Sequence, residues 1–391
     1  MVDNGFTPIL WSALMPVMNY MNICIFDSGA VRKLGGSLKG QGVERPFIVT
    51  DQGIRAAGLL DRVLGALGTE PAAIFDETVS NPTETQAKQA ATLYKECGAD
   101  GIVALGGGSS MDHAKAIGLL ASHDGPLEKY AAFSGGAKFI GKLPPLIAIP
   151  TTAGTGSEVS VGAVICMENG RKETFASQHL IPPVAICDPD LTLGLPAHLT
   201  AATGMDAVTH CIEAVLSPVI NPPAEGVGYE GATRALRDGW LKRAVQDGSD
   251  PEARWNMMMA SYEGALAFVK GLGGVHALSH AAGRLHDKGL HHGTLNAVFL
   301  PHLLRENDGA ADAKYERLRY AMGLQPDANL GDAIERLNSD IGIPENLSAM
   351  GLGANDGAGI VEFALQDLAH RGNAKPLEQS DYERIYTTAL G

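Results

Sequence analysis

The stretch GIVALGGGSSMDHAK, from Gly101 to Lys115, gives the strongest indication of the fold. An apolar run rich in β-branched residues predicts a buried strand, and the glycines after it lead directly into a helical pattern. At the carboxyl end of a parallel strand, the backbone N–H groups of such a turn and the helix N-terminus can hold a pyrophosphate. The letters differ from the GxGxxG fingerprint, so on spacing alone a plain tight turn stays open as the alternative.

Strands and helices alternate on both sides of this stretch. Four further runs predict strands: RPFIVTD (45–51), AAIFDE (72–77), PLIAIPTT (145–152) and VAICDPD (184–190). Amphipathic helical patterns, RAAGLLDRVLGALG and ETQAKQAATLYKECG, separate the first three strands at βαβ spacing. The sequence therefore predicts a parallel sheet that helices cover on both faces.

The strand pattern stops near residue 195. From LTAATGMDAVTHCIEAVLS to DYERIYTTAL the pattern is helical, and Pro189 and Pro196 mark the change. We therefore expect an N-terminal α/β domain of residues 1–195 and an all-α domain of residues 196–391.

Composition limits the classes of partner. With 391 residues and a formal net charge of −14, the chain is long enough for two domain cores, and nucleic acid or an anionic membrane is disfavoured as its main partner. The N-terminus is interrupted by Pro8 and Pro16 and lacks a signal-peptide pattern, and no run approaches the length of a membrane span. The five scattered cysteines fit reduced thiols in the cytoplasm. They are Cys24, Cys97, Cys166, Cys187 and Cys211.

Histidines gather in three segments of the helical half: MDAVTH (205–210), GGVHALSH (273–280) and LHHGTLNAV (290–298). Asp206 and His210 are four residues apart, as are His276 and His280, so each pair lies on one face of a helix. A single such pair is more often a surface hydrogen bond than a metal site. These segments, however, are otherwise small and apolar, which predicts burial, and a cation would neutralise the costly charge of Asp206.

A second polar loop, TTAGTGSEVS (151–160), follows the strand PLIAIP. Two such loops at strand ends mark the crevice where open α/β sheets bind ligands. Asp51 closes the strand PFIVT, where its carboxylate can accept hydrogen bonds from a ribose and would repel a 2′-phosphate. This favours NAD over NADP, and a simple helix or turn cap is the alternative for Asp51.

In this order along the chain, GGGSSMDHAK, PTTAGTGSEVS, MDAVTHCIEA, VHALSH and HHGTLNAVFLP resemble the iron-containing (group III) alcohol dehydrogenases. Within that family, CDPDLTLGLPAHLTAATGMDA, NPPAEG, KGLGGVHALSH and GLHHGTLNAV are most similar to bacterial 4-hydroxybutyrate dehydrogenases. The resemblance implies the dehydroquinate synthase-like fold, with an α/β dinucleotide-binding domain and an all-α metal-binding domain. It also implies NAD, a divalent metal that is usually Fe²⁺, with Zn²⁺ as the alternative, and a homodimer or higher homo-oligomer.

The resemblance also implies roles for individual residues. The metal ligands would be Asp206, His210, His276 and His292, with His280 beside the substrate as a second-sphere or proton-relay group. The cofactor contacts would be Asp51, Asn81, Gly107, Gly108, Ser109, Asp112, Thr151, Thr152, Thr155 and Lys172.

Two features depart from the family pattern. His291 stands where the family usually has the proline of PHG, and the stretch from His276 to His292 is slightly long, so His291 and His286 stay open as alternatives to His292. Lys270, in FVKGLGG, is a cation where many relatives have a small or amide residue. We expect Lys270 to pair with a substrate carboxylate. The alternative is that its amine extends into solvent without a partner.

The function expected from these features is hydride transfer between NAD(H) and a short primary alcohol or aldehyde, with 4-hydroxybutyrate and succinate semialdehyde as the substrate pair. The same chemistry on an uncharged alcohol or a diol, of the lactaldehyde, propanediol or glycerol type, is the alternative. A dehydroquinate synthase-like lyase would need a basic cluster for a phosphorylated substrate, which the sequence lacks. In a non-catalytic subunit, nothing would require the metal ligands to lie next to a nucleotide crevice.

Overall fold

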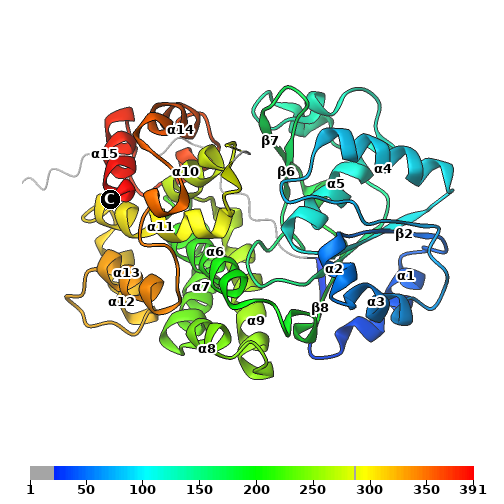
Figure 1. Ribbon diagram of the computed structural model, residues 1–391, viewed down its shortest axis with the longest axis horizontal. Coiled ribbons are helices and arrows are strands. Elements are labelled where there is room, and N and C mark those ends of the chain that lie inside the picture. The colour runs from blue at the N-terminus through cyan, green and yellow to red at the C-terminus, as the bar shows by residue number, and fades with distance from the viewer. Residues whose placement is uncertain (1–21, 286–287) are drawn as a thin grey trace, which may run out of the picture.

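The computed structural model describes residues 22–285 and 288–391, and it places a sheet-containing half beside a helical half (Figure 1). The central sheet has six parallel strands in the order β1-β8-β5-β4-β2-β3. The strands are β1 (Ile23–Phe26), β2 (Pro46–Val49), β3 (Ala73–Phe75), β4 (Gly101–Gly106), β5 (Leu146–Pro150) and β8 (Val184–Cys187). The predicted parallel sheet is confirmed.

Alternation along the strands explains why helices cover both faces. Ile48 and Val103 point to one face and pack with α1 (Leu34–Gly40) and α3 (Leu59–Leu67). Their neighbours Phe47 and Ile102 point to the other face and pack with α4 (Glu84–Glu96) and α5 (Gly108–Ser122). Strands buried on both faces must be apolar throughout, which is the pattern of the predicted runs. A short helix, α2 (Gln52–Ala56), follows β2.

An antiparallel hairpin extends from the sheet half beyond the predicted strands. It consists of β6 (Gly162–Cys166) and β7 (Lys172–Ala176), and Figure 1 shows it at the edge of the sheet half that borders the helical half. The sequence reasoning did not identify these two strands or β1.

After Cys187 the described residues contain no further strand, and α6 begins at Ala197 with Pro196 at its N-cap. Almost every residue of α6 from Thr200 onward is buried, because α7, α9 and α11 pack around it. The helices of this half are α6 (Ala197–Leu216), α7 (Pro222–Ala232), α8 (Trp240–Gln246), α9 (Pro251–Ala267), α10 (Gly274–Ala282), α11 (His292–Glu306), α12 (Asp312–Ala321), α13 (Leu330–Asp340), α14 (Gly357–Ala364) and α15 (Gln379–Leu390).

The two halves meet where the strands of the sheet end. A Cβ on Gly154, in the loop after β5, would lie 2.7 Å from the carbonyl oxygen of Thr203 on α6, so the absence of a side chain permits this close approach. Among the described helices, none is long and apolar enough to cross a membrane. All five cysteines are free thiols, as the sequence predicted.

Candidate metal centre and nucleotide groove

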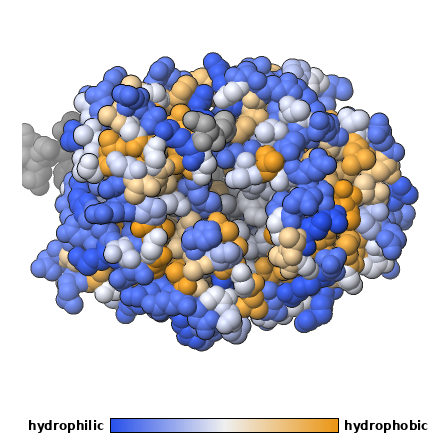
Figure 2. Space-filling view, in the orientation of Figure 1, coloured by the Kyte–Doolittle hydropathy of each residue, from blue (hydrophilic) through white to orange (hydrophobic). Residues whose placement is uncertain are grey.

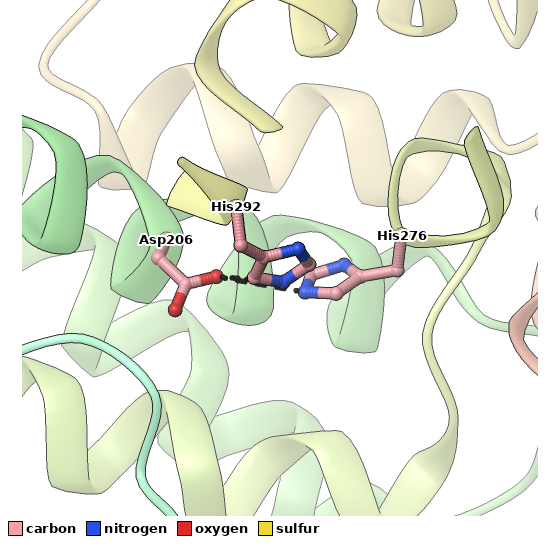
Figure 3. Close-up of side chains that lie close together, drawn as sticks. All are labelled: Asp206, His276 and His292. Carbon is pink, nitrogen blue, oxygen red and sulfur yellow. Dashed lines mark ion pairs between the residues drawn. The ribbon is translucent and has the colours of Figure 1, made fainter. Parts of the chain in front are cut away.

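The four predicted metal ligands come from three helices: three of them, Asp206, His276 and His292, lie together, and the fourth, His210, is placed beside them by its contact with Asp206. Asp206 and His210 lie one turn apart on α6, His276 lies in the first turn of α10, and His292 is the first residue of α11. Figure 3 shows Asp206, His276 and His292 pointing toward one another, and their ligand atoms lie within 4.8 Å of each other. The Nε2 atoms of His210, His276 and His292 lie 3.7, 3.7 and 3.6 Å from Oδ1 of Asp206.

These separations fit a divalent cation. Ligand atoms bound at 2.0–2.2 Å in a tetrahedral site are about 3.3–3.6 Å apart, close to the three distances between Oδ1 of Asp206 and the histidine nitrogens. One carboxylate and three imidazoles form a donor set that suits Zn²⁺ and Fe²⁺. The side chains therefore have both the spacing and the chemistry of a metal site.

Burial sets the charges of the cluster. It lowers the pKa of His210 to about 4 and that of His292 well below its usual value, so both rings are neutral at pH 7, which is the form that binds metal. Burial also lowers the pKa of His276. The hydrogen bonds and negative charges of Asp206 and Glu213 together have the larger effect and raise that pKa to about 9. Without metal, a proton on His276 balances the buried carboxylates. A bound cation would take over that role.

Glu213 orients His276 and was missed by the sequence reasoning. Its buried carboxylate accepts hydrogen bonds from the backbone N–H groups of Gly273 and Val275, at 3.0 and 2.7 Å, and contacts Nδ1 of His276 at 2.6 Å. The contact at Nδ1 leaves Nε2 facing Asp206. Carboxylates in this outer position are typical of metal-binding histidines. Glu213 follows Asp206 by seven residues, or two helical turns. This spacing is the sequence feature that could have identified Glu213.

The Glu213→Gln variant is expected to bind its metal about 10- to 100-fold more weakly, as is usual for loss of such an outer carboxylate. The amide would keep the shape of the side chain but turn an N–H group toward backbone N–H donors, so His276 would lose its orientation. Competition with a chromophoric chelator measures the affinity. Glu230→Gln, an exposed carboxylate on α7, is the matched control. Equal affinities in the two variants would contradict the orienting role.

Asn296 completes the cluster one turn after His292. Its Nδ2 donates to Oδ1 of Asp206 at 2.8 Å and lies 3.3 and 3.2 Å from Nε2 of His276 and His292. Its Oδ1 is buried without a hydrogen-bond partner among the described residues. A buried, unpartnered oxygen beside four convergent ligands is a further feature that fits a cation site.

The remaining histidines lie around the cluster. The His280 ring stacks on that of His292, with centroids 5.1 Å apart, and its Nδ1 lies 3.0 Å from Oδ2 of Asp367. His280 thus adjoins the cluster and points one nitrogen away from it. His291 is exposed and forms the N-cap position of α11, so His292 is the one of the pair that joins the cluster. His286 lies outside the described residues.

A groove of about 430 Å³ leads from the ends of the sheet strands to the cluster. Figure 2 shows the surface hollowed between the two halves. Asp206 and His292 close the groove at the cluster end, joined by His291. Seven of the predicted cofactor contacts line it, namely Asp51, Asn81, Gly107, Gly108, Ser109, Thr152 and Thr155.

Local backbone geometry explains the shape of this groove. Gly106 ends β4 with φ at 147°, a conformation that favours glycine, and α5 begins only two residues later. A Cβ on Gly108 would lie 2.7 Å from Thr155, so the two polar loops touch. Asp51 caps α2 by accepting a hydrogen bond from the N–H of Ile54 at 3.0 Å. Asp51 also lines the groove, so this residue both caps the helix and forms part of the groove wall.

Three predicted cofactor contacts lie outside the groove lining. Thr151 is buried and its N–H donates to the carbonyl of Gly106 at 3.0 Å. Asp112 accepts hydrogen bonds from Ser157 at 2.6 Å and from the N–H of Val164 at 2.9 Å, because its position on α5 faces the second loop and β6. Lys172 donates to Oδ1 of Asn81 at 2.8 Å, and so reaches the groove only through that residue.

The prediction that Lys270 pairs with a substrate carboxylate is wrong. Lys270 is 1% exposed, and its Nζ donates to the carbonyls of Ala214 and Val215 at 3.1 Å each and to that of Ser217. It also lies 3.4 Å from Glu225. The final carbonyls of α6 lack helical partners and attract a cation. Ala214 follows Asp206 by eight residues, or about 12 Å along the helix, so Lys270 is remote from the cluster. The solvent-exposed alternative is excluded as well.

Comparisons with known proteins agree for both halves of the chain. A family model described as "Iron-containing alcohol dehydrogenase" matches residues 22–189, and one described as "Fe-containing alcohol dehydrogenase family, C-terminal" matches residues 200–390. A 4-hydroxybutyrate dehydrogenase of Cupriavidus necator is 48% identical over 96% of this chain and 100% of its own. The crystal structure of a 1,3-propanediol oxidoreductase has a TM-score of 0.90 and 35% identity, over 96% of this chain and 100% of that chain. A sulfoacetaldehyde reductase from Bifidobacterium kashiwanohense, in complex with NAD⁺, has a TM-score of 0.85 and 26% identity, with the same coverage.

Proposed function

We propose, because this chain belongs to the iron-containing alcohol dehydrogenase family, that it transfers hydride between NAD(H) and a short ω-hydroxy acid, with 4-hydroxybutyrate and succinate semialdehyde as the substrate pair. One observation is central to the proposal. The groove that starts at the glycine turn after β4 ends at Asp206 and His292, so a dinucleotide lying along it would bring its nicotinamide to the metal cluster.

The residues of the cluster have separate tasks in this proposal. Asp206, His210, His276 and His292 would hold the cation, with Fe²⁺ expected from the family and Zn²⁺ as the alternative. When bound, the cation supplies a Lewis acid that polarises the carbonyl and favours the alkoxide form of the alcohol. The groove walls align the cofactor with the substrate carbon and exclude water.

His280 is the proposed proton-relay group. Asp367 engages its Nδ1, which leaves Nε2 as the ring nitrogen that can pass a proton between solvent and the substrate oxygen. Since its ring stacks on that of His292, the substrate oxygen at the cluster would lie within reach of His280.

NAD is the proposed cofactor rather than NADP. Asp51 lines the groove at the carboxyl end of β2, where its negative charge would repel a 2′-phosphate. The relative crystallised with NAD⁺ supports the same choice.

An aldehyde survey with both cofactors tests this function. The Fe²⁺-loaded protein is expected to oxidise NADH with succinate semialdehyde at a higher kcat/KM than with butanal or 3-hydroxypropanal. With NADPH, kcat/KM is expected to fall about tenfold or more, because the 2′-phosphate meets the carboxylate of Asp51. The loss of cofactor absorbance gives the rates. Failure with every aldehyde would reject hydride transfer, a preference for 3-hydroxypropanal would favour the diol alternative, and equal use of NADPH would reject the role of Asp51.

We further propose that residues 1–195 form the NAD-binding domain and residues 196–391 the catalytic metal-binding domain. The protein would act in the cytoplasm as a homodimer or higher homo-oligomer, with no nucleic-acid or membrane partner. The net charge of −14 and the free cysteines support this setting. Strand β1 forms one edge of the sheet with Ile23 exposed, a feature that fits pairing with a second copy. Light scattering measures the assembly.

A further inference from the structure

A second pocket, of about 160 Å³, lies between β7 of the sheet half and α14 of the helical half. Both elements lie toward the same end of the molecule, at the top of Figure 1, together with α10. Lys172 stands between the two cavities: it lines this pocket, and its Nζ bonds Asn81 of the nucleotide groove. The pocket therefore adjoins the place where the cofactor and the cluster meet.

Two side chains, Asp367 and His280, connect this pocket to the metal cluster. Asp367 lines the pocket and contacts Nδ1 of His280, whose ring stacks on that of His292. Lys172 also lies close to the end of α10, since a Cβ on Gly283, which follows that helix, would lie 3.4 Å from its Nζ. Contacts through His280 and Asp367 thus lead from the cluster to this pocket.

The charges in the pocket favour an anion. Three cations line it, Arg171, Lys172 and Arg284, against two acids, Glu173 and Asp367. Asp367 already contacts His280, which leaves Glu173 as the acid facing the three cations.

Arg284 is the cation best placed to receive a ligand. It is half-buried, and its guanidinium lies 3.5 Å from the ring centroid of Phe363, so one face is covered by the aromatic ring. Among residues 22–285 and 288–391, its guanidinium has no hydrogen bond or ion pair shorter than 4.0 Å. A half-buried guanidinium that lines a pocket and has one face covered by an aromatic ring has its planar edge as the part that can bind a carboxylate in two-pronged fashion.

We propose that Arg284 binds the carboxylate of the substrate, with Lys172 adding positive charge, while the aldehyde end lies at the cluster. This inference rests on the proposed function and names the residue that would select a four-carbon ω-oxo acid. The carboxyl and aldehyde carbons of succinate semialdehyde are three bonds apart, about 3.8 Å in an extended chain, comparable with the span between consecutive Cα atoms.

The Arg284→Gln variant tests the proposal. Its KM for succinate semialdehyde is expected to rise about 10- to 100-fold, the usual effect of losing a charge-assisted pair, while kcat/KM for butanal stays within about twofold. Arg284→Lys is expected to lie between the two, because it keeps the charge but not the fork. Arg336→Gln, an exposed arginine on α13, is the matched control and is expected to change neither value. An equal change for both aldehydes, or none, would overturn the assignment.

A binding measurement separates this inference from the proposed function. Calorimetric titration with succinate, on metal-loaded protein with unchanged metal content and melting temperature, is expected to show binding to the wild type and about tenfold weaker binding to Arg284→Gln. If the wild type reduces no aldehyde, the proposed function fails, and this titration still decides whether Arg284 is a carboxylate site. Equal succinate affinity in the two proteins would reject it.

Discussion

The His276→Ala variant is expected to lose at least about 1,000-fold in kcat, because the several kcal/mol of Lewis-acid stabilisation disappear with the metal and each factor of ten in rate corresponds to about 1.4 kcal/mol. His276 is the member of the cluster that both carboxylates engage: Glu213 at Nδ1, and Asp206 at 3.7 Å from Nε2. Its removal deletes one ligand and also leaves the carboxylate of Glu213 buried without its imidazole. The three remaining ligands, Asp206, His210 and His292, then lack the fourth donor of the site.

Two measurements test this expectation. Atomic emission gives the metal content after dialysis, and steady-state kinetics at saturating NADH gives kcat. His302→Ala is the matched control, since His302 lies on α11 but outside the cluster. Circular dichroism shows whether each variant is folded. A folded His276→Ala protein with full metal content would reject the site, and an inactive His302→Ala protein would show that any histidine loss in these helices is harmful.

The sheet could be predicted because parallel strands buried on both faces must be apolar along their whole length. The runs PFIV and GIVALG satisfy that condition and form β2 and β4. The hairpin of β6 and β7 was not predicted, because it is only partly buried and its residues alternate with less contrast. Helical periodicity likewise placed Asp206 and His210 on one face of α6.

Residues whose roles depend on tertiary contacts could not be placed from the sequence. Lys270 precedes the histidine helix by only a few residues, yet its position is set by the carbonyls at the end of α6, more than fifty residues earlier. Asp112 follows the glycine turn closely, but the helical phase turns it toward Ser157. Arg284 and Asp367 belong to a pocket assembled from separate segments, and no local pattern relates them. Spacing predicts neighbours on one helix and cannot predict contacts between helices.

Gly293→Ala is expected to disrupt the metal site without altering any ligand. Gly293 follows His292 in the first turn of α11, where this helix crosses α6. A Cβ at this position would lie 2.1 Å from the carbonyl oxygen and 2.8 Å from the carbonyl carbon of Ala202, which are backbone atoms that cannot rotate away. The first turn of α11 must therefore move from α6, and His292 must move away from Asp206.

Because the ligand atoms of the cluster are held 3.6–3.7 Å apart by the packing of α6, α10 and α11, a shift of about 1 Å is enough to lose one ligand. We expect a loss of most of the bound metal and a decrease of about 1–3 kcal/mol in the free energy of unfolding of the metal-free protein, as is usual for overpacking. Chelator competition and urea denaturation measure the two effects. Gly359→Ala on the exposed face of α14 is the control, because a Cβ there has no neighbour within 4 Å. Helix propensity should stabilise that variant by about 0.5–1 kcal/mol with unchanged metal affinity. If Gly293→Ala binds metal as tightly as Gly359→Ala does, the contact between α6 and α11 does not set the geometry of the site.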